Sequence, residues 1–218
     1  MTKKSRRMST KILEPVLRTR SQQRATRTRK RLLEAALAVF IERGVDAATV
    51  EEITQRADLG KGTLYRHFHD KYEIVIMLVE QAVSHLAEYL HSYDSEPKNI
   101  EGVLENLLNA HYNFFVDNSE EFVLLFQGRV LLKFERQTAG ELEEPYARYL
   151  EEIEKMVSPY VSKKIDPAKI RRLACAVAGF VFGFFSFAMV GMDSDEIQTS
   201  IKPLRQVFVR SLSAFLGR

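Results

Sequence analysis

The sequence predicts an all-α protein of about nine helices, in which a small N-terminal helical unit precedes a larger one. Apolar residues recur at spacings of three and four from residue 32 onward, which is the period of an amphipathic helix. No β-branched run alternates cleanly between the glycine and asparagine turn signals that bound strands. With 218 residues, 45% of them hydrophobic, the chain is long enough to bury a sizeable core.

Charge divides the chain into a basic N-terminal segment and an acidic remainder. Residues 1–31 contain 12 basic residues and one acidic residue, whereas the other 187 contain 20 basic and 28 acidic residues. This polarity favours a polyanionic partner for the N-terminus, and residues 1–27 are predicted to form a basic arm in which Pro15 keeps any helix short. A single cysteine, Cys175, and the lack of a visible signal peptide predict a cytoplasmic location.

The first four predicted helices are short or well bounded. The first ends at Gly44, where a left-handed backbone is easily adopted. Thr49 and Glu52 form a capping box that starts the second helix, and Asp70 caps the fourth. These helices are predicted to span about residues 32–43, 50–57, 61–67 and 71–90.

The remaining predicted helices are fewer and longer. Asn99, Asn118 and Asp166 are their candidate N-caps, and Pro167 suits a first helical position. Pro145 is tolerable only in a first turn, and Pro159 should end or kink its helix. These helices are predicted to span about residues 100–116, 119–135, 141–158, 167–190 and 201–216.

The second and third predicted helices form a helix-turn-helix, whose second helix has a basic and aromatic outward face. This arrangement places a helix in the major groove of DNA. Lys61 and Arg66 can contact phosphates or guanine edges, Tyr65 and His67 can donate to phosphate oxygens, and Lys71 can add a phosphate contact. A small helical packing unit beside a basic arm is the structural alternative.

The residues themselves favour the first interpretation. The segment from Leu59 to Phe68, together with Gly44, Thr49 and the pair Asp70-Lys71, closely resembles the DNA-binding segment of TetR-family transcriptional regulators over about residues 28–80. The resemblance implies a DNA-binding domain over residues 28–72 and a helical ligand-binding and dimerisation domain over residues 73–218. The positions that match the family's DNA-contacting residues are Thr49, Lys61, Gly62, Thr63, Tyr65, Arg66, His67 and Lys71.

The resemblance further implies a repressor that binds a palindromic double-stranded DNA operator as a homodimer and is released by a small apolar or amphipathic effector. Where some members of the family place a base-reading arginine, this sequence has Glu51, so base specificity is expected from the third helix or the arm. Two roles remain open for the arm, which either contacts DNA phosphates or the minor groove, or is a solvated tail.

An enzyme, a metal site and a cofactor are not expected. Gly60-Lys61-Gly62-Thr63 lacks the spacing of a phosphate-binding loop. His67 and His69 are surrounded by basic residues, and no nucleophile elbow or metal-binding His or Cys motif occurs.

Residues 100–190 contain 10 of the 14 phenylalanines, and the resemblance implies a ligand cavity among the fifth to eighth helices. Most of these aromatic residues are expected in the core, but His111, Asn113, Gln127 and Arg129 interrupt apolar runs and need partners if buried. Arg129 has two open roles, pairing with a ligand carboxylate or bridging to Glu135 or a neighbouring helix. The candidate ligand contacts are His111, Phe115, Phe126, Arg129, Tyr149 and Phe184.

The uncharged segment 173–192 has two interpretations. Its length suits a membrane span, which would make the protein a membrane-anchored DNA-binding protein, but it also suits a buried helix at a dimer interface. The second interpretation is favoured, because the last helix carries a complementary apolar stripe and small residues allow close helix packing. The predicted interface residues are Gly179, Gly183, Leu204, Phe208, Leu212 and Phe215.

Overall fold

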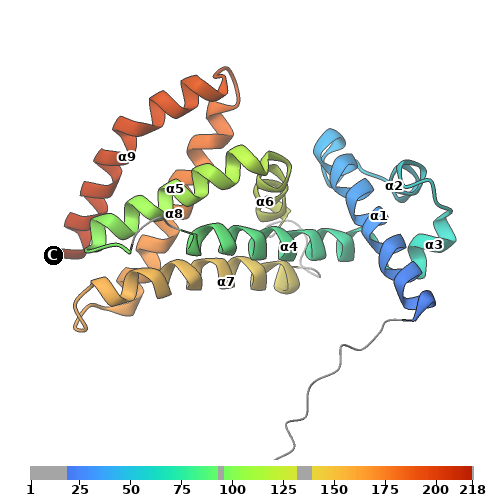
Figure 1. Ribbon diagram of the computed structural model, residues 1–218, viewed down its shortest axis with the longest axis horizontal. Helices are drawn as coiled ribbons and strands as arrows, with labels where there is room; N and C mark the ends of the chain where they lie inside the picture. The colour runs from blue at the N-terminus through green and yellow to red at the C-terminus, as the bar shows by residue number, and fades with distance from the viewer. Residues whose placement is uncertain (1–18, 93–95, 132–138, 218) are drawn as a thin grey trace, which may run out of the picture.

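The computed structural model describes residues 19–92, 96–131 and 139–217. Within these ranges the chain forms nine α-helices and one short 3₁₀ helix, and no β-strand, which confirms the predicted fold class (Figure 1). The helices are α1 (Arg20–Arg43), α2 (Val50–Arg56), α3 (Lys61–Tyr65), α4 (Lys71–His91), α5 (Ile100–Asp117), α6 (Ser119–Leu131), α7 (Ala139–Val157), the 3₁₀ helix η1 (Ser158–Tyr160), α8 (Pro167–Ala188) and α9 (Ser194–Gly217).

Helices α1, α2 and α3 form a small unit at one end of the molecule, away from α8 and α9 (Figure 1). Its core contains the fully buried side chains of Phe40, Ile53 and Leu64. The chain turns between α1 and α2 at Gly44, whose φ of 79° is the left-handed value predicted for it. Helix α4 leaves this unit and packs against α5, α6 and α7, so it joins the two helical units.

Two helices begin earlier than predicted, because their capping boxes lie upstream. Thr19 and Gln22 cap α1 reciprocally, so residues 20–27, assigned to the arm, are helical and the expectation of only a short helix there was wrong. Residues 1–18 of the arm lie outside the described residues. The Asp193 carboxylate accepts a hydrogen bond from the backbone N–H of Glu196, and the Glu196 carboxylate accepts one from the backbone N–H of Asp193. This reciprocal cap starts α9 before residue 201, where the sequence predicts its start.

The larger unit is built around aromatic contacts between α5, α6 and α8. Phe115 stacks on Phe185 with a centroid distance of 4.3 Å, and Phe122 stacks on Phe182 at 5.0 Å. Helix α7 ends at Val157 just before Pro159, as predicted, whereas Pro145 lies inside α7 beyond its first turn. The inner face of α7 is buried, so tertiary packing stabilises the helix around this proline.

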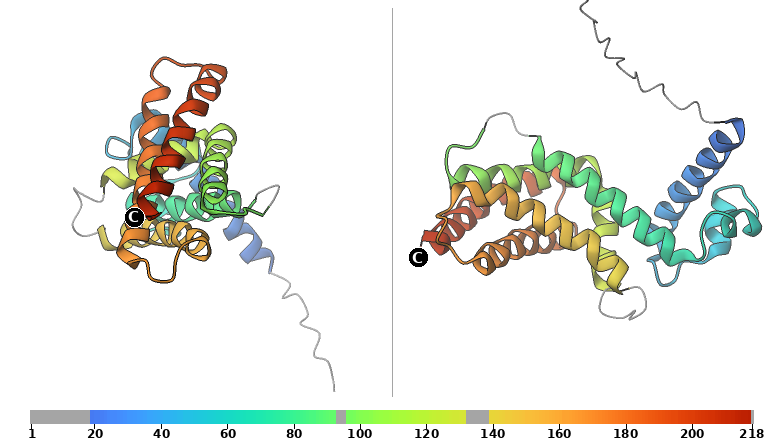
Figure 2. Two further views of the ribbon diagram at one scale, coloured as in Figure 1. Left: turned by 90° about the vertical axis from the view of Figure 1, so that its left-hand side faces the viewer. Right: turned by 90° about the horizontal axis from the view of Figure 1, so that it is seen from below.

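Helix α8 is long and apolar enough to cross a membrane. One side of α8 is nevertheless buried in the protein, where it packs against α5, α6 and α7, and α9 lies beside it (Figure 2). A core helix of this kind passes the same length and composition test as a membrane span, so the membrane-anchored alternative finds no support.

Candidate DNA-binding and ligand-binding sites

The third helix is held by its inner face and presents the other face to solvent. Leu64 is fully buried and Phe68, just after the helix, is 2% exposed, which confirms their assignment to the small core. Tyr65 is 56% exposed, and Lys61 and Arg66 are exposed as well. The outward face of α3 is therefore basic and aromatic.

The other predicted residues of α3 differ in accessibility. A Cβ added to Gly62 would meet no atom within 4 Å, so this position is open on its outer side. Thr63 and His67 are half-buried, and the Thr63 hydroxyl accepts a hydrogen bond from Arg66 at 3.1 Å. Lys61 forms an ion pair with Glu51 of α2. A phosphate that replaces Glu51 as the partner of Lys61 must compete with this carboxylate.

Thr49 is committed to the cap of α2. Its hydroxyl accepts from the backbone N–H of Glu52 at 3.2 Å, and its own N–H donates to the Glu52 carboxylate at 2.9 Å. The hydrogen bonds from the Thr49 backbone and hydroxyl hold the pKa of the Glu52 carboxyl below its ordinary value. Since the hydroxyl is exposed at the N-terminus of a helix, it lies where a phosphate contact is also geometrically open.

Lys71, the last predicted DNA contact, binds backbone carbonyl groups of its own chain. Its Nζ donates to the carbonyl oxygens of Val45 at 2.9 Å, Asp46 at 2.8 Å and Ala48 at 3.1 Å. An ammonium has three N–H donors, so this lysine is saturated by the loop between α1 and α2. Lys71 therefore fixes that loop in the structure, and its phosphate contact stays a prediction, which would require the ammonium to give up a carbonyl partner.

Two of the predicted ligand contacts meet in the core of the larger unit. His111 is 1% exposed, and its Nδ1 lies 2.6 Å from the carbonyl oxygen of Leu107, which can only accept. Burial lowers the pKa of His111 to about 4, so the ring is neutral at pH 7 with the proton on Nδ1. Its Nε2 is then an acceptor, and the Tyr149 hydroxyl donates to it at 2.7 Å.

This pair fixes the hydrogen-bond polarity of a nearby cavity. Tyr149 lines a cavity of about 340 Å³ between α7 and α8, together with Tyr146, Phe182, Gly179 and Arg129. The Tyr146 hydroxyl donates to the carbonyl oxygen of Leu125 at 2.6 Å. Because both phenolic protons are engaged, the two hydroxyls offer only acceptor lone pairs to a molecule in the cavity.

Arg129 supplies the donors that the tyrosines lack. Its guanidinium lies 5.4 Å from the ring centre of Phe126 and 5.6 Å from that of Phe182. It forms no ion pair with any carboxylate in the described part of the chain, while Arg171, which also lines the cavity, pairs with Glu154 at 2.7 Å. Glu135, the alternative partner of Arg129, lies outside the described residues.

The other predicted ligand contacts are not in the lining of this cavity. Phe115 is buried in the aromatic core, and Phe184 stacks on Phe180 with a centroid distance of 6.0 Å. Phe126 and Gln127 face the loop between α1 and α2, and the buried Gln127 Oε1 has no hydrogen-bond partner among the described residues. Asn113 is exposed, so it needs no buried partner.

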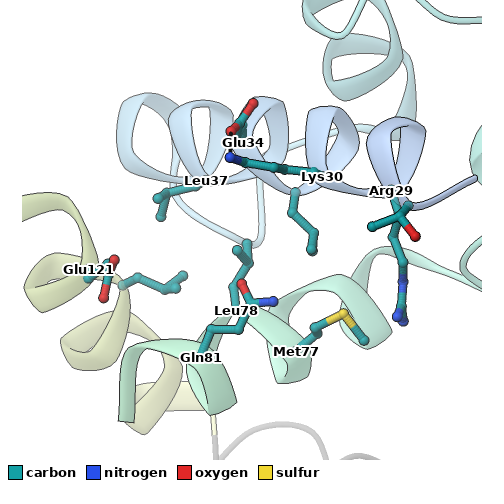
Figure 3. Close-up of a pocket in the computed structure, with 11 residues that line it drawn as sticks. Arg29, Lys30, Glu34, Leu37, Met77, Leu78, Gln81 and Glu121 are labelled. Atoms are coloured by element: carbon teal, nitrogen blue, oxygen red, sulfur yellow. Dashed lines mark ion pairs between the residues drawn. The ribbon is translucent and has the colours of Figure 1, made fainter. Parts of the chain in front are cut away.

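A larger cavity that the sequence did not predict lies between the two helical units. It measures about 490 Å³ and is lined by α1 on one side and by α4 and α6 on the other (Figure 3). Leu37, Met77 and Leu78 contribute apolar surface to it, and Arg29 and Glu121 are among its charged residues. Nothing in the sequence pattern indicated it, because its walls come from three helices far apart in the chain.

The predicted dimer residues differ in how far they are exposed on the surface of the single chain. Leu204 and Phe215 are exposed, and a Cβ at Gly183 would meet no atom within 4 Å. Phe208 is half-buried and stacks on Phe180 at 4.2 Å, whereas Leu212 is buried within its own chain. Gly179 is exposed and also borders the α7–α8 cavity. In the described residues no cluster of His, Cys, Asp and Glu could hold a metal ion.

Comparison with known proteins gives consistent matches. Residues 32–78 match the model of bacterial regulatory proteins of the tetR family. An uncharacterized HTH-type transcriptional regulator, TtgW of Pseudomonas putida, is 32% identical over 111 residues, which are 48% of this chain and 77% of that protein. The HTH-type transcriptional activator FasR of Mycolicibacterium smegmatis is 30% identical over 99 residues, 45% of each chain. The chain thus spans about half the length of FasR.

Solved structures share the fold. A transcriptional regulator FadR from Bacillus subtilis, in complex with stearoyl-CoA, matches with a TM-score of 0.67 and 16% identity over 84% of this chain and 96% of that chain. The TetR-family regulator PfmR from Thermus thermophilus matches with a TM-score of 0.58 and 22% identity over 83% and 97% of the two chains.

Proposed function

Because the chain belongs to the TetR family of bacterial transcriptional regulators, we propose that it is a ligand-responsive repressor that acts in the cytoplasm and binds a palindromic operator as a homodimer. The observation that carries the proposal is the outward face of α3, where the exposed Tyr65 lies between Lys61 and Arg66 while Leu64 anchors the helix. In this role α3 enters the major groove, and Gly62, Thr63 and His67 lie close to the DNA backbone.

The exposed apolar surface of α8 and α9 supports a homodimer. Phe187 is 82% exposed and Val190, just after α8, is 81% exposed, and Leu204 and Val207 of α9 are exposed too. Contiguous apolar surface on a soluble protein marks an interaction site, and a two-fold partner presents the same surface in return. Such a dimer holds its two α3 helices about 34–36 Å apart, one turn of DNA.

The effector proposed here is a small amphipathic molecule that binds in the α7–α8 cavity. The apolar rings of the wall accommodate its body, and the unpaired Arg129 binds an acidic group. The structural relative FadR binds stearoyl-CoA, an amphipathic ligand with a charged end, which is consistent with this class.

Ligand binding reaches the DNA-binding unit through α6. Tyr146 of the cavity wall donates to Leu125 of α6, and Phe126 and Gln127 of the same helix face the loop that Lys71 holds. A ligand that fits only a conformer with a shifted α6 changes the spacing of the α3 helices and releases the operator. It can shift the equilibrium only by its difference in affinity for the two conformers.

Selection of bound sequences from random duplex DNA tests the proposal. We expect a palindromic consensus with half-sites one helical turn apart, bound by a species of twice the chain mass. Tyr65→Ala should abolish the preference for that consensus without changing the melting temperature, since Tyr65 is exposed. Failure to enrich any sequence, or enrichment that Tyr65→Ala leaves intact, would refute the role given to α3.

A further inference from the structure

The N-terminal half of α1 carries a row of arginines on one side. Arg20, Arg24, Arg27 and Arg31 follow one another at intervals of four, three and four residues, which places their side chains along the same helical face. All four are exposed. The capping box of Thr19 and Gln22 makes this segment helical from its first residue, so the row has a defined geometry.

The first three arginines of the row lack compensating negative charge. The first acidic residue after the start of α1 is Glu34, and it pairs with Lys30 at 3.5 Å. Arg20, Arg24 and Arg27 take part in no ion pair within the described ranges. Like charges spaced four residues apart on a helix repel each other, so this row lowers the stability of the free protein. An anionic partner removes that repulsion.

The row ends at the helix-turn-helix. Arg31 donates to the carbonyl oxygen of Ala57 at 2.6 Å and lies 3.9 Å from Asp58, and both residues belong to the turn between α2 and α3. The N-terminal end of α1 lies at the same end of the molecule as α2 and α3, away from α8 and α9 (Figures 1 and 2). A duplex that lies against α3 is therefore close to the free arginines.

We propose that Arg20, Arg24 and Arg27 form a second DNA-contacting surface, which binds the phosphate backbone beside the bases that α3 reads. This inference rests on the proposed DNA-binding role of α3. Arg20 and Arg31 are separated by about 16 Å along the helix axis at about 1.5 Å per residue. Each DNA strand carries a phosphate about every 3.4 Å along its axis, so several phosphates lie within reach of the row. Guanidinium groups bind phosphate through paired N–H donors.

A membrane surface is the competing partner for a basic helix. A helix that lies in a bilayer interface needs an apolar face opposite its basic one. Between Thr19 and Arg31 the only apolar side chain is Ala25. Apart from the arginines of the row, the other intervening residues are serine, glutamine and threonine, with Arg29 and Lys30. The composition of the segment therefore favours nucleic acid.

The test compares two triple variants by fluorescence anisotropy on the selected operator at several salt concentrations. The first is Arg20→Gln, Arg24→Gln and Arg27→Gln, in which glutamine keeps helix propensity and side-chain length. The second replaces three exposed lysines of the other unit with glutamine and loses the same net charge: Lys98→Gln, Lys163→Gln and Lys164→Gln.

The arginine variant should lower the slope of log affinity against log salt by about 5 for the dimer, because each of its six lost contacts contributes about 0.9. The ratio of operator to random-duplex affinity should stay unchanged, since phosphate contacts carry no sequence information. The lysine variant should match the wild type. Replacing the same arginines with lysine should retain most of the slope.

An equal slope of log affinity against log salt in the two triple variants would overturn the inference. The same loss of slope in the arginine-to-lysine protein would also overturn it, because that result would indicate a structural effect of the arginines. Reduced sedimentation of the arginine variant with phosphatidylserine vesicles, at an unchanged DNA slope, would assign the row to membranes instead. In each case, operator binding by the wild type and its loss in Tyr65→Ala would leave the role of α3 standing.

Discussion

Replacing Lys71 with methionine separates a structural role from a phosphate contact. Methionine keeps the apolar stem but leaves the carbonyls of Val45, Asp46 and Ala48 without their donor. A hydrogen bond to a charged group contributes roughly 1.5–3 kcal/mol. Lys71 is half-buried, so water can replace part of the three bonds, and we expect the free energy of unfolding to fall by about 2–3 kcal/mol.

Urea unfolding followed by circular dichroism measures this change. The matched control is Lys61→Met, which removes an exposed lysine that pairs with Glu51 on the surface. Exposed ion pairs contribute about 0–1 kcal/mol, so the control should unfold close to the wild type.

The salt dependence of operator binding supplies the second measurement. If Lys71 only fixes the loop, Lys71→Met weakens binding without changing the slope of log affinity against log salt. If Lys71 contacts a phosphate, the slope falls by about 0.9 per subunit. A reduced slope with unchanged stability would refute the reasoning drawn from the three carbonyl contacts.

Local signals in the sequence predicted most of the fold. The N-caps at Thr49, Asp70, Asn99 and Asp166 are all observed, because a cap depends on residues no more than three positions apart. The start of α1 at Arg20 was not predicted, although it too is marked by a local cap. The density of arginine near the N-terminus indicated an unstructured arm, whereas the cap formed by Thr19 and the lack of proline and glycine up to Arg43 favour a helix.

The site was less predictable, because its contacts join distant parts of the chain. The sequence indicates that His111 needs a polar partner if it is buried. The structure supplies that partner from within the chain, since Tyr149, 38 residues later, donates to the imidazole. The partners of Lys71 lie 23 to 26 residues before it, on the far side of α2 and α3. No spacing rule at the sequence level relates a residue to carbonyls at that distance.

Three further substitutions test the dimer, the effector contact and the route through α6. Gly183→Ala should raise the helix stability of the monomer by about 0.5–1 kcal/mol, since no atom of the chain meets the new methyl group. The same substitution should weaken a dimer in which the two α8 helices approach closely, and sedimentation equilibrium would measure that loss. Arg129→Met should abolish the response of operator binding to the effector at an unchanged melting temperature, whereas a clear drop in melting temperature would assign Arg129 a structural bridge. Gly128→Ala places a Cβ 2.7 Å from the Tyr146 hydroxyl oxygen and 3.0 Å from a methyl carbon of Val79. The Tyr146 hydroxyl cannot retreat without giving up its hydrogen bond to α6, so the overpacking cost of about 1–3 kcal/mol should exceed the roughly 1 kcal/mol that alanine adds to the helix. The melting temperature should therefore fall, and it should fall less when Gly128→Ala is made in a Tyr146→Phe protein, which lacks the oxygen that the methyl meets. Equal losses in the two backgrounds would mean that Tyr146 does not press on α6 at Gly128, and the proposed route from the cavity to the DNA-binding unit would lose its first step.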